Sequence, residues 1–435
     1  MKIRAIAAAW GSILATVTNV AAQSSVSTRS VAPVLAISSE PLAAVSQVRE
    51  LPGGRILVND NSGRRLLLFD STLKLLRVVA DTTSATAHAY PATLGGLVAF
   101  RADSSLLVDP DGLFMLVLDP SGRIVRTMAV PQASEVNYLI GGPYGTPGLD
   151  SHERLVYKAR VGGFVKVYGP RAPGQSAAPE IPDSAMVVRF DLATRVSDTV
   201  AKLLIPNVVQ RVSRDENGYT TISRIVNPLP WVDDWALLSD GVIAVVRGRD
   251  YKVEFFAPDD QREPAIQIPF AWERLRDEDK SAILDSARIA LALAQTSTGT
   301  AVPSNSQSDS ASRRRRPLPT EGAPVVRGGG GVTRAAMMTS NIQLVSVDEM
   351  PDYRPPIRLA AALGDTDGNL WVRTTKLEDG GAVYDVIRPI IGLVVRFRVP
   401  PGRVIVGFGR EGVVYMGVLD GKYARLERAR VSVRP

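Results

Sequence analysis

The sequence predicts an all-β fold: a six-bladed β-propeller with one inserted helix and a disordered loop between the fourth and fifth blades. The first observation is a strand-turn-strand unit, clearest in residues 51–70 (LPGGRILVNDNSGRRLLLFD), that returns about six times before the C-terminus. The second is the spacing of its copies, which suits four-stranded blades. A single blade cannot bury both of its faces, so neighbouring blades must stack in a ring that closes.

Two series of apolar runs define the units. The second strand of each unit is predicted at residues 55–59, 106–109, 155–160, 242–247, 370–374 and 413–418, and the next strand at residues 64–69, 113–118, 186–190, 251–257, 382–387 and 424–431. Gly-Gly and Asp-Gly turns separate the runs, and these residues tolerate the positive φ of tight hairpins. The units are 50, 49, 87, 128 and 43 residues apart, measured between Leu57, Leu107, Val156, Ile243, Trp371 and Val414. Three steps match one blade, and the two long steps contain insertions.

The N-terminus is predicted to be a signal peptide, residues 1–22. Lys2 and Arg4 precede an apolar stretch, and Ala22 ends a small-residue cleavage site. We therefore expect a periplasmic or secreted protein, cleaved near Ala22, with no transmembrane segment left; the rival interpretation is an uncleaved N-terminal anchor. The propeller is assigned to residues 33–435. Its first run, residues 33–38 (PVLAIS), has no partner in its own unit and is expected to complete the last blade as its outer strand.

Residues 271–350 interrupt the repeat. A helix is predicted at about 273–295, lying against the propeller, because Ile283, Leu284, Ala287, Ala290, Leu291 and Ala294 share one helical face and Asp277, Glu278 and Asp279 suit the first turn. Residues 296–334 are rich in Ser, Thr, Gln, Gly and Pro, so we expect them to be disordered. A lesser insertion, residues 162–182, is rich in Gly and Pro and is expected to form a loop on one rim.

Composition limits the chemistry that the chain can carry. It has no cysteine and only two histidines, His88 and His152, which excludes a structural zinc site and any multi-histidine metal centre. The net charge of +7 comes from 51 basic residues, of which 42 are arginine. Such a balance suits an anionic partner, but it is also the arginine usage of a GC-rich genome, and the even spread of the charges favours the second explanation.

Several local motifs are weighed and set aside. Residues 407–412 match GxGxxG, but a strand follows them where a dinucleotide site needs a helix, so we interpret them as a hairpin turn. The Asp-rich turns at residues 109–112 and 365–368 could bind calcium, yet both lack the further ligands of an EF-hand loop. The arginine run at residues 313–316 is interpreted as a solvated segment of the disordered loop, and no nucleic-acid partner is expected.

Charged residues recur at or just after strand ends. Strand ends of a propeller converge on a shared mouth, so these residues are the candidate lining of one polar funnel. The ligand-binding candidates are Asp60, Arg64, Arg101, Asp109, Lys158, Arg160, Asp234, Arg247, Arg249, Asp250 and Arg373. The alternative is that they form salt bridges and cap turns at the rim, which we expect of most of them. No catalytic and no metal-ligating residue is assigned.

The repeated units resemble exported six-bladed β-propeller proteins of the broad NHL/TolB-like class. The likeness rests on LPGGRILVNDNSGRRLLLFD, DWALLSDGVIAVVRGRDYKVEFF, DTDGNLWVRTT and PPGRVIVGFGREGVVYMGVLD, taken in order. Related groups include calcium-dependent lactone hydrolases, a lyase that acts on a cyclic peptide antibiotic, and many binding modules. The lactonase-like enzymes use a Glu, Asn and Asp set around an axial metal. Glu50, Asn61, Asn137 and Asp150 fall in comparable regions, but none stands in a matching local motif.

The resulting hypothesis is an exported, non-catalytic binding or interaction module built on a six-bladed propeller. It is expected to be a monomer, to need no cofactor, and to bind an unknown polar or anionic ligand or an envelope protein. The alternative is a metal-assisted hydrolase or lyase of the lactonase-like type with a calcium-like ion on the propeller axis.

Overall fold

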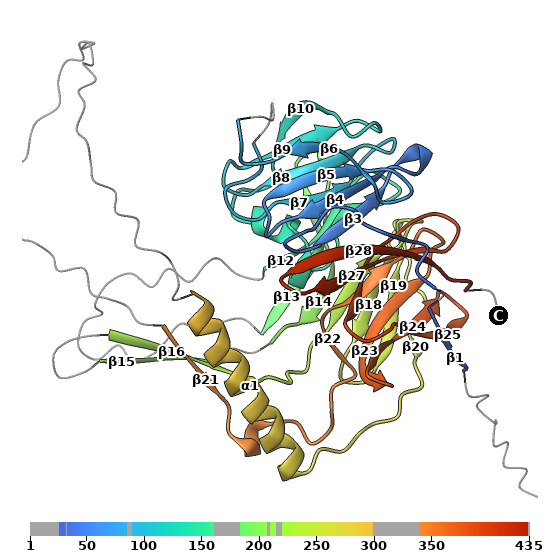
Figure 1. The fold of residues 1–435 in the computed structure, drawn as a ribbon. Coiled ribbons are helices and arrows are strands. Elements are labelled where there is room, and N and C mark those ends of the chain that lie inside the picture. Colours follow the sequence, from blue (N-terminus) through green and yellow to red (C-terminus); the bar gives the residue numbers. More distant parts are fainter. Residues whose placement is uncertain are drawn as a thin grey trace, which may run out of the picture.

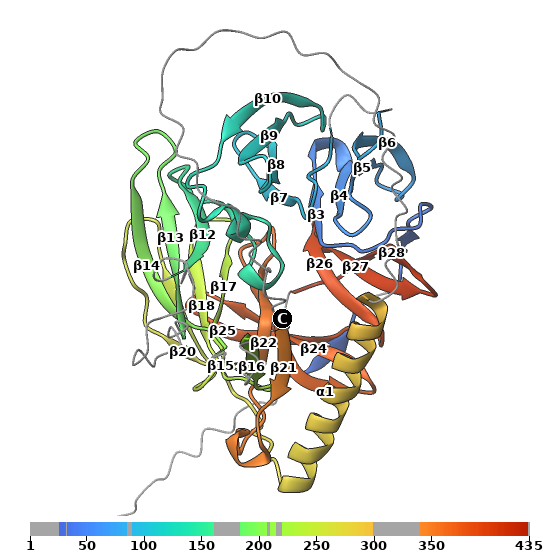
Figure 2. The same ribbon diagram turned by 90° about the vertical axis from the view of Figure 1, so that its left-hand side faces the viewer.

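Six sheets surround a central axis in the computed structural model of this protein, and the predicted six-bladed β-propeller is confirmed (Figures 1 and 2). The structure describes residues 26–31, 33–84, 89–160, 183–206, 209–214, 220–298 and 340–433. We number the blades 1 to 6 in chain order. In blades 1 to 5 four strands follow one another from the axis outward, and the first strands of blades 6, 1, 2 and 3, and of blades 4 and 5, are in contact around the axis.

The blades have the following strands. Blade 1 contains β3 (Gln47–Glu50), β4 (Ile56–Asp60), β5 (Arg65–Phe69) and β6 (Leu75–Ala80). Blade 2 contains β7 (Gly96–Ala99), β8 (Ser105–Asp109), β9 (Phe114–Leu118) and β10 (Ile124–Ala129). Blade 3 contains β11 (Gly148–Leu149), β12 (Leu155–Arg160), β13 (Ser184–Phe190) and β14 (Ser197–Leu204).

The second half of the ring repeats this plan. Blade 4 contains β17 (Asp234–Leu237), β18 (Ile243–Arg247), β19 (Lys252–Phe256) and β20 (Ile266–Gln267). Blade 5 contains β22 (Ile357–Gly364), β23 (Leu370–Glu378), β24 (Gly381–Arg388) and β25 (Gly392–Arg398). Blade 6 contains β26 (Arg403–Phe408), β27 (Val413–Asp420) and β28 (Tyr423–Arg430). All twelve runs predicted as second and third strands are strands of these blades.

Apolar cores lie between neighbouring blades and explain why the central strands are continuous apolar runs in the sequence. In β18, Ala244 and Val246 pack into the core shared with blade 5, whereas Ile243 and Val245 pack into the core shared with blade 3. Both faces of the strand are therefore buried, and no polar residue is needed at alternate positions. The core between blades 6 and 1 has the same character, so the ring closes without a gap.

The N-terminal segment completes the last blade, as predicted. Strand β2 (Ala36–Ile37) pairs with β28 and forms the outer edge of blade 6, and Leu42 beyond it is fully buried. A second N-terminal strand, β1 (Thr28–Ser30), was not expected: it adds to blade 5 by pairing in parallel with β25. The N-terminal segment thus covers the outer edges of two blades, which removes two exposed strand edges.

The insertion forms a small unit outside the ring. Helix α1 (Asp277–Thr298) begins four residues later than predicted, and its buried Leu284 packs with Leu229, Leu275 and Met350. These partners come from connecting segments, so the helix does not lie directly on a blade as expected. Beside it, β15 (Val209–Arg214), β16 (Thr220–Val226) and β21 (Ser340–Leu344) form a three-stranded sheet that the sequence analysis missed (Figure 1).

Four short 3-10 turns complete the described structure: η1 (Pro52–Gly54), η2 (Val136–Leu139), η3 (Gly142–Tyr144) and η4 (Val347–Glu349). The predicted signal peptide, the loop at residues 162–182 and residues 299–334 of the predicted disordered loop lie outside the described residues. Within the described part of the chain, no helix combines the length and apolar character needed to cross a membrane.

Candidate functional site

One face of the ring carries the described part of the insertions between blades. The connections from one blade to the next open onto this face, and α1 and the three-stranded sheet belong to the connections that precede blades 4 and 5. We call it the helix-bearing face. The hairpins between the first and second strands of each blade lie on the opposite face, where Arg101 pairs with Glu153 at 3.1 Å and the Thr366 hydroxyl donates to the carbonyl of Gly409 at 2.9 Å.

Most of the candidate residues do share one face. Ten of them stand at strand ends or hairpins that open onto the helix-bearing face: Asp60, Arg64, Asp109, Lys158, Arg160, Asp234, Arg247, Arg249, Asp250 and Arg373. Arg101 is the exception, since it lies on the opposite face with its guanidinium over the ring of Phe100. The side chain of Arg160 lies outside the described part. The hydrogen bonds and ion pairs of each residue determine whether its charge is available to a ligand.

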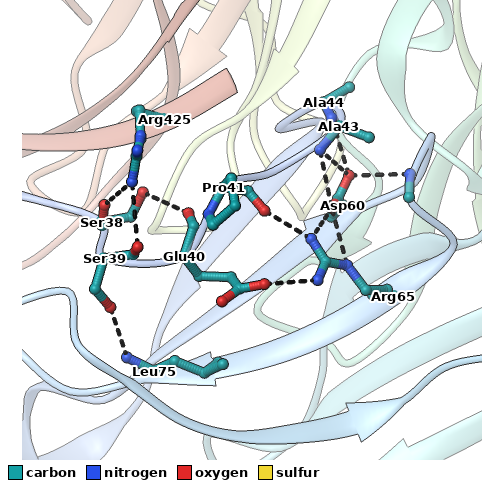
Figure 3. Close-up of polar contacts among 11 residues, drawn as sticks. Ser38, Ser39, Glu40, Pro41, Ala43, Ala44, Asp60, Arg65, Leu75 and Arg425 are labelled. Atoms are coloured by element: carbon teal, nitrogen blue, oxygen red, sulfur yellow. Dashed lines mark hydrogen bonds and ion pairs between the residues drawn. The ribbon is translucent and has the colours of Figure 1, made fainter. Parts of the chain in front are cut away.

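Asp60 fastens the N-terminal segment to blade 1. Its carboxylate accepts the backbone amides of Ala43 and Ala44, and Arg65 donates to it at 2.8 Å (Figure 3). Arg65 also pairs with Glu40 at 2.9 Å, so the segment that leads from β2 to β3 is held at two points. Asp60 is fully buried and its oxygens are satisfied, which makes it a structural residue.

Asp109 and Arg247 are also engaged within the fold. The Asp109 carboxylate accepts the amides of Asp111 and Gly112 in its own hairpin. The Arg247 guanidinium pairs with Asp233 at 2.8 Å and with Glu254 at 2.7 Å. Arg64 and Arg249 are exposed, and Asp250 is exposed beside Lys252 at 3.4 Å. The expectation that rim charges mostly cap turns and form ion pairs therefore holds for Asp60, Asp109 and Arg247.

A short segment between blades 2 and 3 crosses the propeller axis. Residues 141–145 touch the side-chain amide of Gln47 in blade 1, and the Tyr144 carbonyl accepts the indole N–H of Trp235 in blade 4 at 3.0 Å. The same segment contacts β22 of blade 5, and in Figure 2 it lies near the centre of the ring. Gly145 has φ of +87° and ψ of −167°, a conformation open only to glycine, and a Cβ there would meet Trp235. We call this segment the axial plug.

Two buried charges lie beneath the plug. Asp234 is 0% exposed, and one of its carboxylate oxygens accepts the amides of Ala361 at 2.6 Å and Ala362 at 2.9 Å, while the other has no partner in the described part of the chain. Burial raises the pKa of Asp234 to about 6, and these amides and Lys158 oppose the rise. Lys158 is 4% exposed, contacts the Pro143 carbonyl at 3.5 Å, and has its pKa lowered by burial. Both side chains are closed off from solvent.

Three arginines gather at the entrance to β22. Arg358 lies at the start of this strand, Arg373 lies on the neighbouring β23, and Arg354 precedes them. Partial burial lowers the pKa of Arg358, and the positive charges of Arg354 and Arg373 lower it further. Arg354 is held by Glu273 through two hydrogen bonds, at 2.7 and 3.1 Å. Within the described structure neither Arg358 nor Arg373 has an ion pair. We call these three residues the arginine cluster.

A cleft of about 470 Å³ opens beside the arginine cluster. Arg354 and Arg358 form part of its wall, and helix α1 provides the opposite wall; the remaining lining residues are Pro228, Asp279, Ala282, Ile283, Ser286 and Ala287. Arg373 was among the residues predicted from the sequence, but Arg354 and Arg358 were not, because Arg354 stands in the Pro-rich connection before β22 and Arg358 at the start of this first strand of its blade, which was not predicted. The only local signal is the pair of arginines that brackets Pro355 and Pro356.

The described residues do not fit an axial calcium ion. No three side chains of His, Asp or Glu come together in that part of the chain. Of the four residues compared with the lactonase-like set, Glu50 and Asp150 lie towards the opposite face, whereas Asn61 and Asn137 lie on the helix-bearing face. In the other Asp-rich turn, both oxygens of Asp365 are used by the turn and by the Trp371 indole. Hence we derive no metal-dependent step.

The remaining motifs do not form a site in the described structure. Residues 407–412 lead from β26 directly into β27, as expected of a hairpin. His152 stands in an exposed turn beside Arg154. His88 and the arginines at 313–316 lie outside the described residues.

Comparison with known proteins yields only distant similarities. No protein-family model and no curated protein sequence matches the chain. Among solved structures it is similar to the calcium-binding protein regucalcin of Agrobacterium tumefaciens, with 12% identity, a TM-score of 0.37, and coverage of 94% of this chain and 98% of that chain. A candidate gluconolactonase matches with 11% identity, a TM-score of 0.37, and coverage of 92% and 94%. Virginiamycin B lyase of Staphylococcus aureus with quinupristin matches with 9% identity, a TM-score of 0.32, and coverage of 89% and 81%. Likeness at this level carries no argument about what this chain binds.

Proposed function

We propose that this protein is an exported, non-catalytic binding module that holds an anionic ligand on its helix-bearing face, at the arginine cluster. The observation that carries the proposal is the gathering of Arg354, Arg358 and Arg373, two of which have no acidic partner in the described structure. Like charges held together oppose one another, and an anion bound among them would relieve that repulsion. Arginine also presents the planar donor fork that suits carboxylate and phosphate groups.

The surrounding structure supports a binding role. The arginine cluster borders a cleft whose volume, about 470 Å³, lies in the range of small-molecule sites. Helix α1 and the blade both contribute walls, so a ligand would be held between two separate elements. The described residues supply no nucleophile with an adjacent base and no converging metal ligands at this cleft, which favours binding over the alternative of a metal-assisted hydrolase or lyase.

Anion binding can be tested by thermal melting in citrate or inorganic phosphate, against sodium chloride at the same ionic strength. Both anions should raise the melting temperature of the wild-type protein, since a ligand that binds only the native state stabilises it. The double variant Arg358→Ala/Arg373→Ala should lose that rise. Arg126→Ala, at an exposed arginine on β10 with no side-chain hydrogen bond or ion pair in the described structure, is the matched control and should retain it. Equal stabilisation of the double variant and the wild type would reject the proposal.

Export is the second part of the proposal, and it rests on residues 1–22 alone. The basic start, the apolar stretch and the small residues before Gln23 are those of a cleaved signal peptide. N-terminal sequencing of protein recovered from the cell envelope or the medium should begin at Gln23. Recovery of a chain that still begins at Met1 would favour the uncleaved anchor.

A further inference from the structure

We propose that the ligand of the arginine cluster is an amphiphile: a single acidic headgroup carrying one alkyl chain, with the chain lying along helix α1. This inference rests on the proposed anion binding and names the class of anion. The inference is motivated by the different chemistry of the two walls of the cleft. One wall carries the guanidinium groups of Arg354 and Arg358, and the other carries the small and apolar helix residues Ala282, Ile283 and Ala287.

The apolar wall does not end at the cleft. On a helix, residues 282, 286, 289 and 293 form one row, because they are spaced by three and four positions. Ala282 and Ser286 line the cleft, and the row then continues to Ile289, which is 63% exposed, and Leu293, which is 65% exposed. From Ala282 to Leu293 the helix rises by roughly 16 Å. The large apolar side chain of Ile289 is therefore mostly exposed on the same row that forms the cleft wall.

This arrangement matches a chain with a charged end better than it matches a small polar anion. A small anion such as phosphate would satisfy the arginines but would leave the apolar row exposed. A neutral apolar ligand would use the row but would leave Arg358 and Arg373 without an acidic partner. An acidic amphiphile satisfies both: its headgroup is placed at Arg354 and Arg358, and its chain covers Ile289.

The remaining polar groups of the cleft fix the orientation. Asp279 is the acidic residue of the lining, and its carboxylate accepts the backbone amide of Arg276 at 2.9 Å in the first turn of the helix. An acidic headgroup is repelled from that end and attracted to the arginines. The chain then runs toward the C-terminal end of α1, where Ser286 is the last polar residue of the row before Ile289.

The test is a calorimetric titration of the full-length mature protein with straight-chain carboxylates from acetate to decanoate, all below their micelle concentrations. Affinity should increase by up to about fourfold for each methylene that becomes buried, the factor expected for transfer of one CH₂ from water. Ile289→Asn should remove the gain for the longest chains and leave acetate binding unchanged. Val125→Asn, at a similarly exposed position on β10, is the matched control and should behave as the wild type. Arg358→Ala should weaken every member of the series by a similar factor.

Each of the other possible results of this titration would reject a specific part of the two proposals. If all chain lengths bind with equal affinity, the amphiphile is wrong while anion binding stands. If no carboxylate binds, and citrate and phosphate also fail, both proposals fall. If decyltrimethylammonium binds as tightly as decanoate, the helix surface attracts any alkyl chain and the assignment of an acidic headgroup is wrong.

Discussion

Replacing Asp234 with asparagine should change the pH dependence of folding in one defined window. Burial raises the pKa of Asp234 from an ordinary value of 3.8 to about 6, so the native state holds this proton more tightly than the unfolded chain does. The free energy of unfolding therefore falls as the pH rises from about 4 to about 6, and this contribution is constant outside that window. Two pKa units correspond to about 3 kcal/mol, and the fully buried carboxyl needs no reduction for solvent screening.

The Asp234→Asn variant lacks this titration and should lack this loss of stability. We expect the difference in unfolding free energy between variant and wild type to shift by about 3 kcal/mol in favour of the variant between pH 4 and pH 7. Urea unfolding with verified refolding measures it at each pH, and other titrating groups cancel in the difference. Asp198→Asn, an exposed position on β14, is the matched control and should show no such shift. A difference that stays within about 1 kcal/mol across the range would refute this account of Asp234, because a shift of one pKa unit is worth about that much.

Three further predictions concern the parts added to the blades. Truncation of the mature chain before residue 41 should lower the melting temperature far more than truncation before residue 31, because only the first removes the outer strand of blade 6; similar melting of both would contradict ring closure by that strand. Gly145→Ala should lower the free energy of unfolding by about 3 kcal/mol or more, because its backbone conformation is open only to glycine and a Cβ would meet the buried indole of Trp235. Gly142→Ala, with open space around it, should lower it by about 1 kcal/mol in the same denaturant assay. Leu284→Ala should cost about 3 kcal/mol within the small helix core, so hydrogen exchange should quicken in α1 and not in the blades; quickening throughout would show that the helix core and the ring unfold together.

The blades could be predicted because the reason for their sequence pattern is local. A strand such as β18 is buried on both faces and bounded by tight turns, so its apolar run and its Asp-Gly punctuation are visible in any copy of the repeat. The outer strand of blade 6 was also predictable, since the run at residues 33–38 had no local partner. Strand β1 was not, because its three mostly exposed residues carry no apolar pattern and it is defined only by its partner β25.

The site was predictable only in outline. Charge at strand ends predicted residues of which ten of the eleven share one face, but it could not separate a satisfied carboxylate such as Asp60 from an unpaired guanidinium such as Arg373. That distinction depends on residues far away in the chain: Asp60 is satisfied in part by Ala43 and Ala44, whereas Arg373 is opposed by Arg358. No spacing rule within the repeat encodes these contacts.

The charged residues of this face are of two kinds, and the stability of the fold explains only one of them. Arg247 is neutralised by Asp233 and Glu254, and such a residue is explained by the stability of the fold alone. Arg358 and Arg373 are not explained in this way, because they repel each other and have no acidic partner in the described structure. The cluster lies where helix α1 interrupts the repeat. The repeat therefore accounts for the ring, and the interruption before blade 5 carries the charges on which the proposed anion binding rests.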